Sequence, residues 1–277
     1  MITPKLGPFL GIPRSSWRIQ TNNYCSLHCE FCCTMCHVPI HPESPYVDRR
    51  KKWEIKPRTI ELLCERFKGI GERDPHRLAG GETTAMPLDL VEEIVEILYN
   101  HNRHVWLLTN GYDLMGLSQR CLDMLSHINL DDHGINREHI LRCHKYLKEN
   151  FKGRSGIVTT LVHEDWDCAR KHPDNVRTEP CDGMMRSPTV SRGAIYPCCM
   201  SSHTDLMRYD MPSNKALKDA GWTFENPDIV ETLRNWRTTL PEFVYHKCLT
   251  DCPRPHNDIC GSAKITLKPN DVLWRQR

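Results

Sequence analysis

The sequence lacks the marks of an exported, membrane-spanning or strongly charged protein. No apolar run approaches the roughly 18 residues that cross a bilayer, and Met1–Lys5 opens no secretory signal. There is no internal repeat and no low-complexity segment. Lys and Arg number 37 against 35 Asp and Glu, which argues against a protein built mainly to coat nucleic acid or an acidic membrane. We expect a cytoplasmic globular protein with no membrane partner.

Cysteine, in contrast, is abundant, at 15 of 277 residues. Without signs of export, such cysteines are expected to be metal ligands or catalysts rather than disulfides. Most of them fall into two groups, which suggests two metal sites. The first group lies within twelve residues and comprises Cys25, Cys29, Cys32, Cys33 and Cys36. The second lies in the last hundred residues and comprises Cys181, Cys198, Cys199, Cys248, Cys252 and Cys260.

Hydrophobic periodicity predicts alternating strands and helices up to about residue 180. The expected strands are 17–22, 76–79, 105–108, 127–130, 157–162 and, with the weakest pattern, 176–178. The expected helices are 59–70, 88–99, 117–125, 138–151 and 164–171. Strict alternation implies parallel strands with right-handed crossovers. We therefore predict an α/β fold, a partial (β/α)6-type barrel, with its chemistry at the C-terminal ends of the strands.

The composition changes after about residue 180. Thr189–Tyr196, with Arg192-Gly193 at its centre, predicts a β-hairpin. Asn226-Pro227 then predicts a helix from Asp228 to about Leu240, with proline at the first helical position. We expect residues 1–180 to form the barrel core and residues 181–277 a small cysteine-rich α+β module.

The first cysteine group contains a C-x3-C-x2-C run, Cys25, Cys29 and Cys32, with Phe31 before the third cysteine. A [4Fe–4S] cube usually takes four thiolates. Three thiolates in one short loop can hold three irons and leave the fourth open to a small molecule, as the open position of a catalytic zinc does.

This run resembles the signature of the radical S-adenosylmethionine (SAM) superfamily. The resemblance implies that SAM chelates the open iron and is split by one electron, and that the resulting 5′-deoxyadenosyl radical takes a hydrogen atom from a substrate. Gly80-Gly81-Glu82, after the second strand, resembles the Gly-Gly-Glu motif that contacts the methionine amino group, where glycine would let backbone approach the ligand. The backbone around Phe31 would hold adenine. The resemblance places polar contacts to ribose and methionine after the third and fourth strands, at Thr109, Asn110, Asn129 and Asp131.

A four-thiolate zinc site is the alternative for this loop. Cys29, Cys32, Cys33 and Cys36 have suitable spacing for structural zinc without catalysis. A structural zinc would not need Gly80-Gly81-Glu82, so the radical interpretation is favoured. Cys33 and Cys36 could otherwise be spare ligands, hydrogen donors or buried small hydrophobic residues.

The second group resembles the SPASM or twitch modules of some radical SAM enzymes. Cys181, Gly193 and Cys198 fit the opening C-x9–15-G-x4-C motif, but the fuller SPASM run is absent. The resemblance implies one auxiliary [4Fe–4S] cluster that handles electrons, and structural zinc on the same ligands is the alternative. The ligands we predict are Cys181, Cys198, Cys248 and Cys252, with Cys199 and Cys260 as alternates for Cys198 and Cys252.

We therefore expect a radical SAM enzyme, an oxidoreductase or a peptide- or small-molecule-modifying enzyme, whose net reaction is oxidation, epimerisation or bond formation. Its partners would be a one-electron reductant such as flavodoxin or ferredoxin and a small-molecule or peptide substrate. The alternatives are a nucleoside or nucleic-acid substrate, or a noncatalytic zinc or nucleic-acid-binding protein. Cys168 is a candidate hydrogen donor, whereas Cys64, Cys121 and Cys143 are expected to pack in the core.

Overall fold

The structure is a computed structural model that describes residues 16–27, 52–159, 188–197 and 217–240. A seven-stranded sheet runs through it in the order β5-β4-β3-β2-β1-β6-β7. All neighbouring strands are parallel except the final pair, β6 and β7. The strands are β1 (Trp17–Gln20), β2 (Pro75–Ala79), β3 (His104–Thr109), β4 (His127–Asp132), β5 (Arg154–Thr159), β6 (Thr189–Ser191) and β7 (Ala194–Tyr196). The predicted α/β class with a mainly parallel sheet is confirmed.

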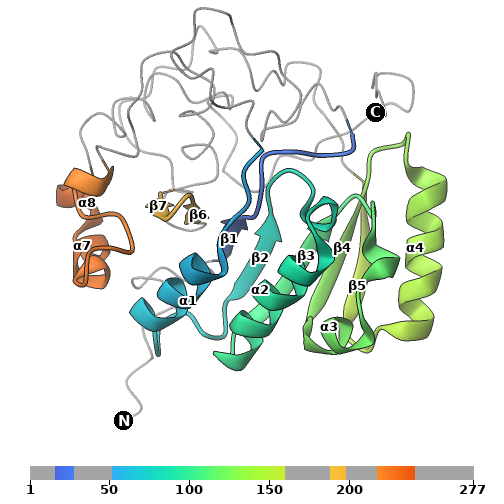
Figure 1. Ribbon diagram of the computed structural model, residues 1–277, viewed down its shortest axis with the longest axis horizontal. Helices are drawn as coiled ribbons and strands as arrows, with labels where there is room; N and C mark the ends of the chain where they lie inside the picture. The colour runs from blue at the N-terminus through green and yellow to red at the C-terminus, as the bar shows by residue number, and fades with distance from the viewer. Residues whose placement is uncertain (1–15, 28–51, 160–187, 198–216, 241–277) are drawn as a thin grey trace, which may run out of the picture.

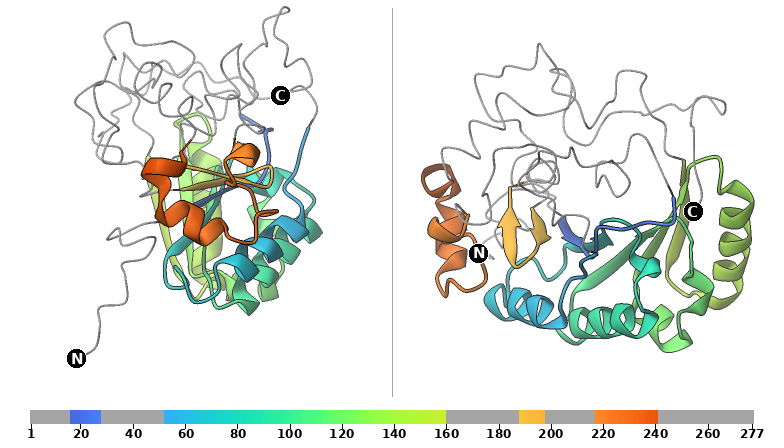
Figure 2. Two further views of the ribbon diagram at one scale, coloured as in Figure 1. Left: turned by 90° about the vertical axis from the view of Figure 1, so that its left-hand side faces the viewer. Right: turned by 45° about the horizontal axis from the view of Figure 1, so that its top comes forward.

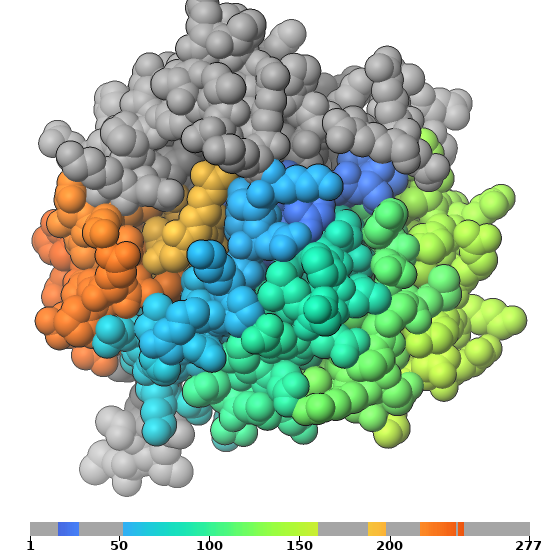
Figure 3. Space-filling model, in the orientation of Figure 1, coloured from blue at the N-terminus to red at the C-terminus, as the bar shows by residue number. Residues whose placement is uncertain are grey.

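Helices connect the first five strands and lie along one face of the curved sheet, as the views of Figures 1 and 2 show together. In the space-filling view they form a layer over the front of the molecule (Figure 3). The connecting helices are α1 (Pro57–Arg66), η2 (Thr83–Ala85), α2 (Leu88–Asn100), η3 (Leu114–Gly116), α3 (Gln119–Met124) and α4 (Arg137–Asn150). Two short helices, α7 (Ile229–Arg234) and α8 (Trp236–Thr239), lie beyond the hairpin. No helix within the described ranges is both long and apolar enough to cross a membrane.

The main core fills the space between the sheet and the helices. Trp17 and Ile19 of β1 are completely buried there, and the ring of Trp17 meets that of Phe67 edge-on, with centroids 4.9 Å apart. Alternate residues of each strand point to opposite faces, so the neighbours of these apolar residues project from the other face, which we call the inner face. It carries Arg18, Gln20, Arg77, Trp106, His127, Asn129 and Asp131. A polar inner face matches the partial barrel predicted here better than a sheet with helices packed on both sides.

The short hairpin extends this sheet at the β1 edge. Arg18 and Ile19 of β1 pair with Thr189 and Val190 of β6, and β7 turns back antiparallel to β6. Arg192 and Gly193 both have positive φ at the turn, +50° and +80°. The predicted hairpin is confirmed. The division at residues 180 and 181 stays a prediction, because it falls in 160–187, outside the described residues.

Several sequence-based boundaries need correction. The helix expected over 59–70 begins at Pro57 and ends at Arg66. β5 begins at Arg154 because it pairs residue by residue with β4 from His127 onward, three residues before the apolar run at Ile157 that suggested a strand. The helix expected over 228–240 is interrupted at Asn235, which separates α7 from α8. Pro227 precedes the N-cap residue Asp228 and is therefore not the first helical residue. The predicted elements 164–171 and 176–178 lie outside the described residues.

Candidate active site at the carboxyl ends of the strands

The ends of β2 and β3 meet on the carboxylate of Glu82. This residue is 2% exposed. Its Oε1 accepts hydrogen bonds from the backbone N–H and hydroxyl of Thr84, at 3.0 and 2.8 Å, and from the hydroxyl of Thr109, at 2.6 Å. Its Oε2 accepts from the backbone N–H of Asn110, at 2.7 Å. One buried side chain therefore joins the end of β2 to the end of β3.

Burial and hydrogen bonding act on the pKa of Glu82 in opposite directions. Burial in the low-dielectric interior is the larger effect and raises the pKa, while the donors from Thr109, Asn110 and Thr84 lower it. The two backbone N–H groups can only donate, so they match the carboxylate rather than the acid form. Glu82 is thus held by groups that are aimed at a negative charge.

The glycines before Glu82 are required by the chain that leaves β1. A Cβ on Gly81 would lie 2.0 Å from the backbone oxygen of Tyr24, and one on Gly80, whose φ is +144°, would lie 2.9 Å from that of Asn22. The backbone N–H of Gly81 donates to the oxygen of Asn22, at 3.1 Å, and that of Glu82 donates to the oxygen of Tyr24, at 2.7 Å. The expected reason for glycine was the approach of backbone to a ligand; the observed close neighbour is the protein's own backbone.

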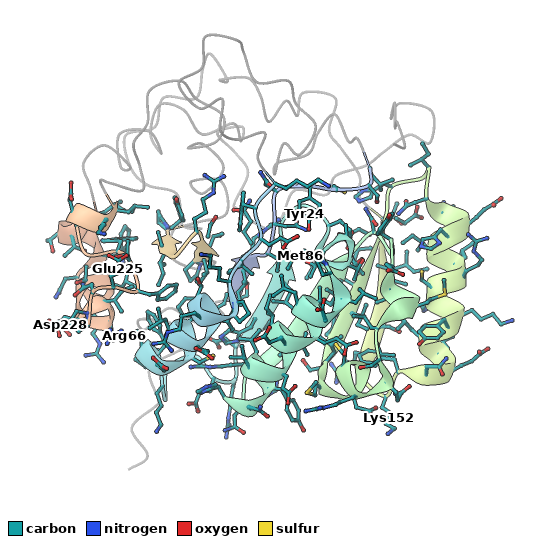
Figure 4. All side chains as sticks on the ribbon, in the orientation of Figure 1. Tyr24, Arg66, Met86, Lys152, Glu225 and Asp228 are labelled. Carbon is teal, nitrogen blue, oxygen red and sulfur yellow. The ribbon has the colours of Figure 1, made fainter. Side chains whose placement is uncertain are left out.

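The segment that follows β1 also forms hydrogen bonds with the residues just before α1. Asn22 forms an isolated antiparallel bridge with Glu54, and Asn23 Oδ1 accepts from the backbone N–H of Trp53, at 3.0 Å. The hydroxyl of Tyr24 donates to Glu54. Burial, and after it this hydrogen bond, raises the pKa of Tyr24 above its ordinary value. Figure 4 shows Tyr24 at the carboxyl edge of the sheet. The chain is therefore rigidly positioned just before the cysteine motif.

Cys25, the first cysteine of the motif, lies at this edge and its sulfur is hydrogen-bonded. Its Sγ is 3.3 Å from the side-chain Nδ2 of Asn110 and 3.3 Å from the backbone N of Leu27. Asn110 Nδ2 is also 3.3 Å from the hydroxyl of Ser26. Two N–H donors on one sulfur suit a thiolate, since the negative charge strengthens each bond.

Asn110 is held by the start of α4. Its backbone oxygen accepts from Asn136 Nδ2, at 3.1 Å, and its Oδ1 accepts from the backbone N–H of Tyr112, at 3.0 Å. His139 Nε2 lies 2.5 Å from the carbonyl of Gly111, whose φ is +85°. No local pattern predicts the roles of Asn22, Asn136 and His139, because they depend on contacts between distant segments. Thr84 is a local partner of Glu82, two residues after it, and was also not predicted.

Asn129 and Asp131 lie within β4, which corrects the expectation that they follow it. Both project from the inner face, and Asn129 Oδ1 is 2.6 Å from His127 Nε2. The pKa of Asp131 rises from 3.8 to about 7, first because burial disfavours its charge and second because Glu82 repels it, whereas Arg18 acts in the opposite direction. A carboxyl that titrates near neutral pH in such a place is a candidate for chemistry or recognition.

The structure brings one cysteine and the two polar motifs together, namely Cys25, Gly80, Gly81, Glu82, Thr109 and Asn110. Cys64, Cys121 and Cys143 are buried in the hydrophobic core, as predicted. The other predicted residues lie outside the described ranges: Phe31, Cys29, Cys32, Cys33, Cys36, Cys168, Cys181, Cys198, Cys199, Cys248, Cys252 and Cys260. Among the described residues, no group of three or more His, Cys, Asp or Glu side chains could hold a metal ion.

Comparison with known proteins gives distant structural matches. No family profile and no curated protein sequence matches the chain. The structure titled native anSMEcpe with bound AdoMet and Cp18Cys peptide matches at 17% identity and a TM-score of 0.40, over 54% of this chain and 44% of that one. Streptococcus suis SuiB bound to S-adenosylmethionine matches at 13% identity and a TM-score of 0.42, over 83% of this chain and 68% of that one. This chain thus spans less than half the length of the anSMEcpe chain. Likenesses at these scores establish neither family nor function.

Proposed function

We propose that the protein is a radical SAM enzyme. The observation that carries the proposal is the position of Cys25 at the carboxyl edge of a parallel sheet, hydrogen-bonded to Asn110 and adjacent to the Gly80-Gly81-Glu82 turn. These are the first cysteine and the two polar motifs of the sequence resemblance, and they come from loops that follow three successive strands. A structural zinc loop would not require this meeting of loops.

The described residues fit the proposed cofactors in two respects. The sulfur of Cys25 accepts two N–H donors, which is the environment of thiolates that ligate iron–sulfur clusters. The side-chain Oδ1 of Asn22 is buried beside Gly81, and no described group donates to it. Its amide Nδ2 donates to the backbone oxygen of Glu82, at 2.6 Å, which leaves Oδ1 as the buried acceptor of this side chain that is still open to a donor. Such an acceptor suits the ammonium group of a methionine moiety.

Within this proposal, Cys25, Cys29 and Cys32 would hold a [4Fe–4S] cluster, which would supply the one-electron reduction of SAM that gives a 5′-deoxyadenosyl radical for hydrogen abstraction. Asn110 holds the sulfur of Cys25 through its amide and ties it to β3. Glu82 fixes the geometry of both loops by its four hydrogen bonds, and Asn22 orients the methionine end of SAM. The inner face, including Asn129 and Asp131, faces the substrate and the ribose.

The remaining parts of the proposal rest on sequence. A second [4Fe–4S] cluster on Cys181, Cys198, Cys248 and Cys252, with Cys199 and Cys260 as alternates, would accept or return an electron after abstraction. Flavodoxin or ferredoxin would supply the first electron. The substrate is a small molecule or a peptide, and Cys168 is a candidate hydrogen donor.

Anaerobic reconstitution tests the proposal. The full chain, loaded with iron and sulfide and then given dithionite and SAM, is expected to form 5′-deoxyadenosine. Cys25→Ala should abolish its formation, whereas Cys121→Ala, which removes a buried thiol in α3, should retain it. A loaded Cys25 loop that forms no 5′-deoxyadenosine refutes the proposal. Zinc without acid-labile sulfide in the purified protein would support the noncatalytic alternative instead.

A further inference from the structure

A row of paired residues crosses the inner face below the candidate site. Arg18 of β1 is the register partner of Arg77 on β2 and of Thr189 on β6. Arg77 is in turn the partner of Trp106, and Trp106 of His127. Neighbouring strands lie about 4.8 Å apart, so the two arginines leave the sheet side by side. Like charges directly opposite each other on neighbouring strands are destabilising unless something compensates them.

Arg77 has contacts that orient its guanidinium but do not neutralise it. The group lies over the ring of Trp106, with 5.1 Å from Cζ to the centroid, and that ring lies 4.5 Å from the ring of His127. Burial, with repulsion from Arg18, lowers the pKa of Arg77. Its Nε–H is buried and reaches no acceptor within the described part of the chain. A stacked guanidinium with a free Nε edge presents the planar fork that carboxylates and phosphates bind.

Two further buried groups on the same face, the amide NH2 of Gln20 and the hydroxyl of Thr189, have no hydrogen-bond partner among the described residues. Gln20 is fully buried, and its Oε1 accepts from the hydroxyl of Ser191, at 2.7 Å, so its amide NH2 is left to donate. The hydroxyl of Thr189 is also fully buried and unpaired within the described ranges. Each buried polar group without a partner costs about 1–3 kcal/mol. The three groups come from β1, β2 and β6 and share a need for an acceptor.

The described strands place little negative charge on the inner face to supply that need. Asp131 is the acidic residue that the described strands place on this face, and its pKa of about 7 leaves it partly protonated at neutral pH. Arg154, the register partner of His127, adds another positive charge at the β5 end of the row. The cations therefore outnumber the carboxylates on the described part of this face.

We propose that this row is a binding site for an oxyanion, a carboxylate or phosphate group carried by the substrate. Arg77 binds it through its Nε edge, Arg18 adds positive charge, and Gln20 and Thr189 donate hydrogen bonds. Arg77 precedes Gly81 by four residues, or roughly 13 Å along an extended chain, so the remainder of a small substrate reaches from this row toward the candidate site. The assignment of the bound group to a substrate rests on the proposed function; the anion site itself does not.

Thermal unfolding of the full-length protein tests the site without SAM or reductant. At constant ionic strength and pH 7.5, replacing chloride with inorganic phosphate in one arm, and with acetate in the other, is expected to raise the unfolding temperature in at least one arm. The arm that responds identifies a phosphoryl or a carboxylate preference. Arg77→Gln should weaken the apparent affinity about tenfold to a hundredfold, since a hydrogen bond to a charged group is lost.

Arg58→Gln is the matched control, because Arg58 is exposed on α1 and pairs only with Glu61 and Glu65 among the described residues. It should retain the full response. If Arg77→Gln does not fold, Thr189→Val, which keeps the shape and removes the hydroxyl, should weaken binding several-fold. Equal stabilisation by chloride, or an unchanged response in Arg77→Gln or in a folded Thr189→Val, overturns the site. Loss of 5′-deoxyadenosine formation with anion binding intact would overturn the enzymatic proposal alone.

Discussion

At the scale of single residues, Gly81 is the position where the packing of the site leaves no freedom. Gly81→Ala would place a Cβ 2.0 Å from the backbone oxygen of Tyr24, and backbone cannot yield as a flexible side chain does. We expect a loss of about 2–4 kcal/mol in the free energy of unfolding, measured by urea denaturation. Gly156→Ala is the control, because no atom lies within 4 Å of a Cβ there; it should change stability by less than about 0.5 kcal/mol. Equal stability of both variants would contradict the described loop packing.

The raised pKa of Asp131 predicts that the free energy of unfolding depends on pH. Its pKa is about 7 in the folded protein against an ordinary 3.8, so the folded state binds the proton more tightly than the unfolded state. The stabilisation from protonation is complete below about pH 4 and is lost as the pH rises through 7. Asp131→Asn mimics the protonated side chain. We expect the unfolding temperature of the variant, relative to that of the wild type, to increase as the pH rises from 5 to 8. The increase should reach about 2–5 °C at pH 8. A constant difference across this range would show that Asp131 does not titrate there.

The hydrogen bond from Asn110 to Cys25 predicts an effect on reduction potential. A donor to a ligand sulfur stabilises the more negative, reduced cluster, so, if Cys25 ligates the proposed cluster, Asn110→Ala should make the reduction potential of that cluster more negative. One hydrogen bond of roughly 1 kcal/mol corresponds to a shift on the order of 40 mV for a one-electron couple. Anaerobic potentiometric titration of the reconstituted protein measures it. Asn150→Ala, at the far end of α4, should leave the potential unchanged, and a shift as large as that of Asn110→Ala would contradict the assignment.

Sequence reasoning identified the candidate residues but not the contacts that connect them. Glycine at 81 and glutamate at 82 were recognisable as a motif, and their position after a strand followed from the hydrophobic pattern. The dependence of Gly81 on Tyr24, or of Glu82 on Thr109, joins segments that the chain separates by 57 and 27 residues. No local pattern encodes such a meeting, so Asn22 and Asn136 could not be predicted.

At the scale of elements, the C-terminal end of α1 depends on one arginine from the turn before β3. Arg103 is 4% exposed, and its guanidinium donates to the backbone oxygens of Ile70 and Phe67, at 2.7 and 2.8 Å, with Cys64 O at 3.4 Å. A positive charge there satisfies carbonyls that the helix leaves unpaired. Arg66, in the last turn of the same helix, reaches instead to the backbone oxygen of Phe224, at 3.3 Å, in the segment that bears Glu225 (Figure 4).

Replacing Arg103 tests this helix-capping role. Arg103→Met keeps the aliphatic stem but removes the guanidinium N–H donors from these carbonyls, so we expect a loss of about 2–4 kcal/mol in urea denaturation. Arg120→Met is the matched control, because Arg120 is exposed and forms a surface ion pair with Glu96; it should cost less than about 1 kcal/mol. A similar cost for both variants would mean that the three carbonyls do not depend on Arg103.

The elements themselves were largely predictable where their periodicity was long. The thirteen-residue α2 has its apolar residues on one face, and its expected span of 88–99 differs from the observed helix by one residue. The three-residue strands β6 and β7 are too short for any period; the turn at Arg192-Gly193 identified them as a hairpin. Their attachment to β1 rather than to a separate sheet could not be predicted, because it depends on a partner more than 160 residues away in sequence.

At the scale of the whole molecule, this attachment bears on the predicted division at residues 180 and 181. β6 covers the edge of β1, and the backbone N–H of Arg18 donates to the oxygen of Pro188, at 2.9 Å. The backbone N–H of Ile195 in β7 in turn donates to the oxygen of the fully buried Trp222, at 2.9 Å. Removing everything after residue 180 would expose the edge of β1, which invites association with other chains.

We therefore expect a fragment of residues 1–180 to aggregate or to unfold without cooperativity. A fragment of residues 1–240, which retains the hairpin and Trp222, should aggregate less and unfold more cooperatively. Size-exclusion chromatography and the steepness of urea unfolding, followed by far-UV circular dichroism, compare the two with the full chain. A monomeric 1–180 fragment with a cooperative transition would show that the parallel core folds alone, and that the hairpin belongs to a separate unit that merely docks on β1. Aggregation confined to the shorter fragment would show that the sheet is completed by residues beyond the cysteine that opens the second group, so that the core and the predicted auxiliary-cluster unit fold as one.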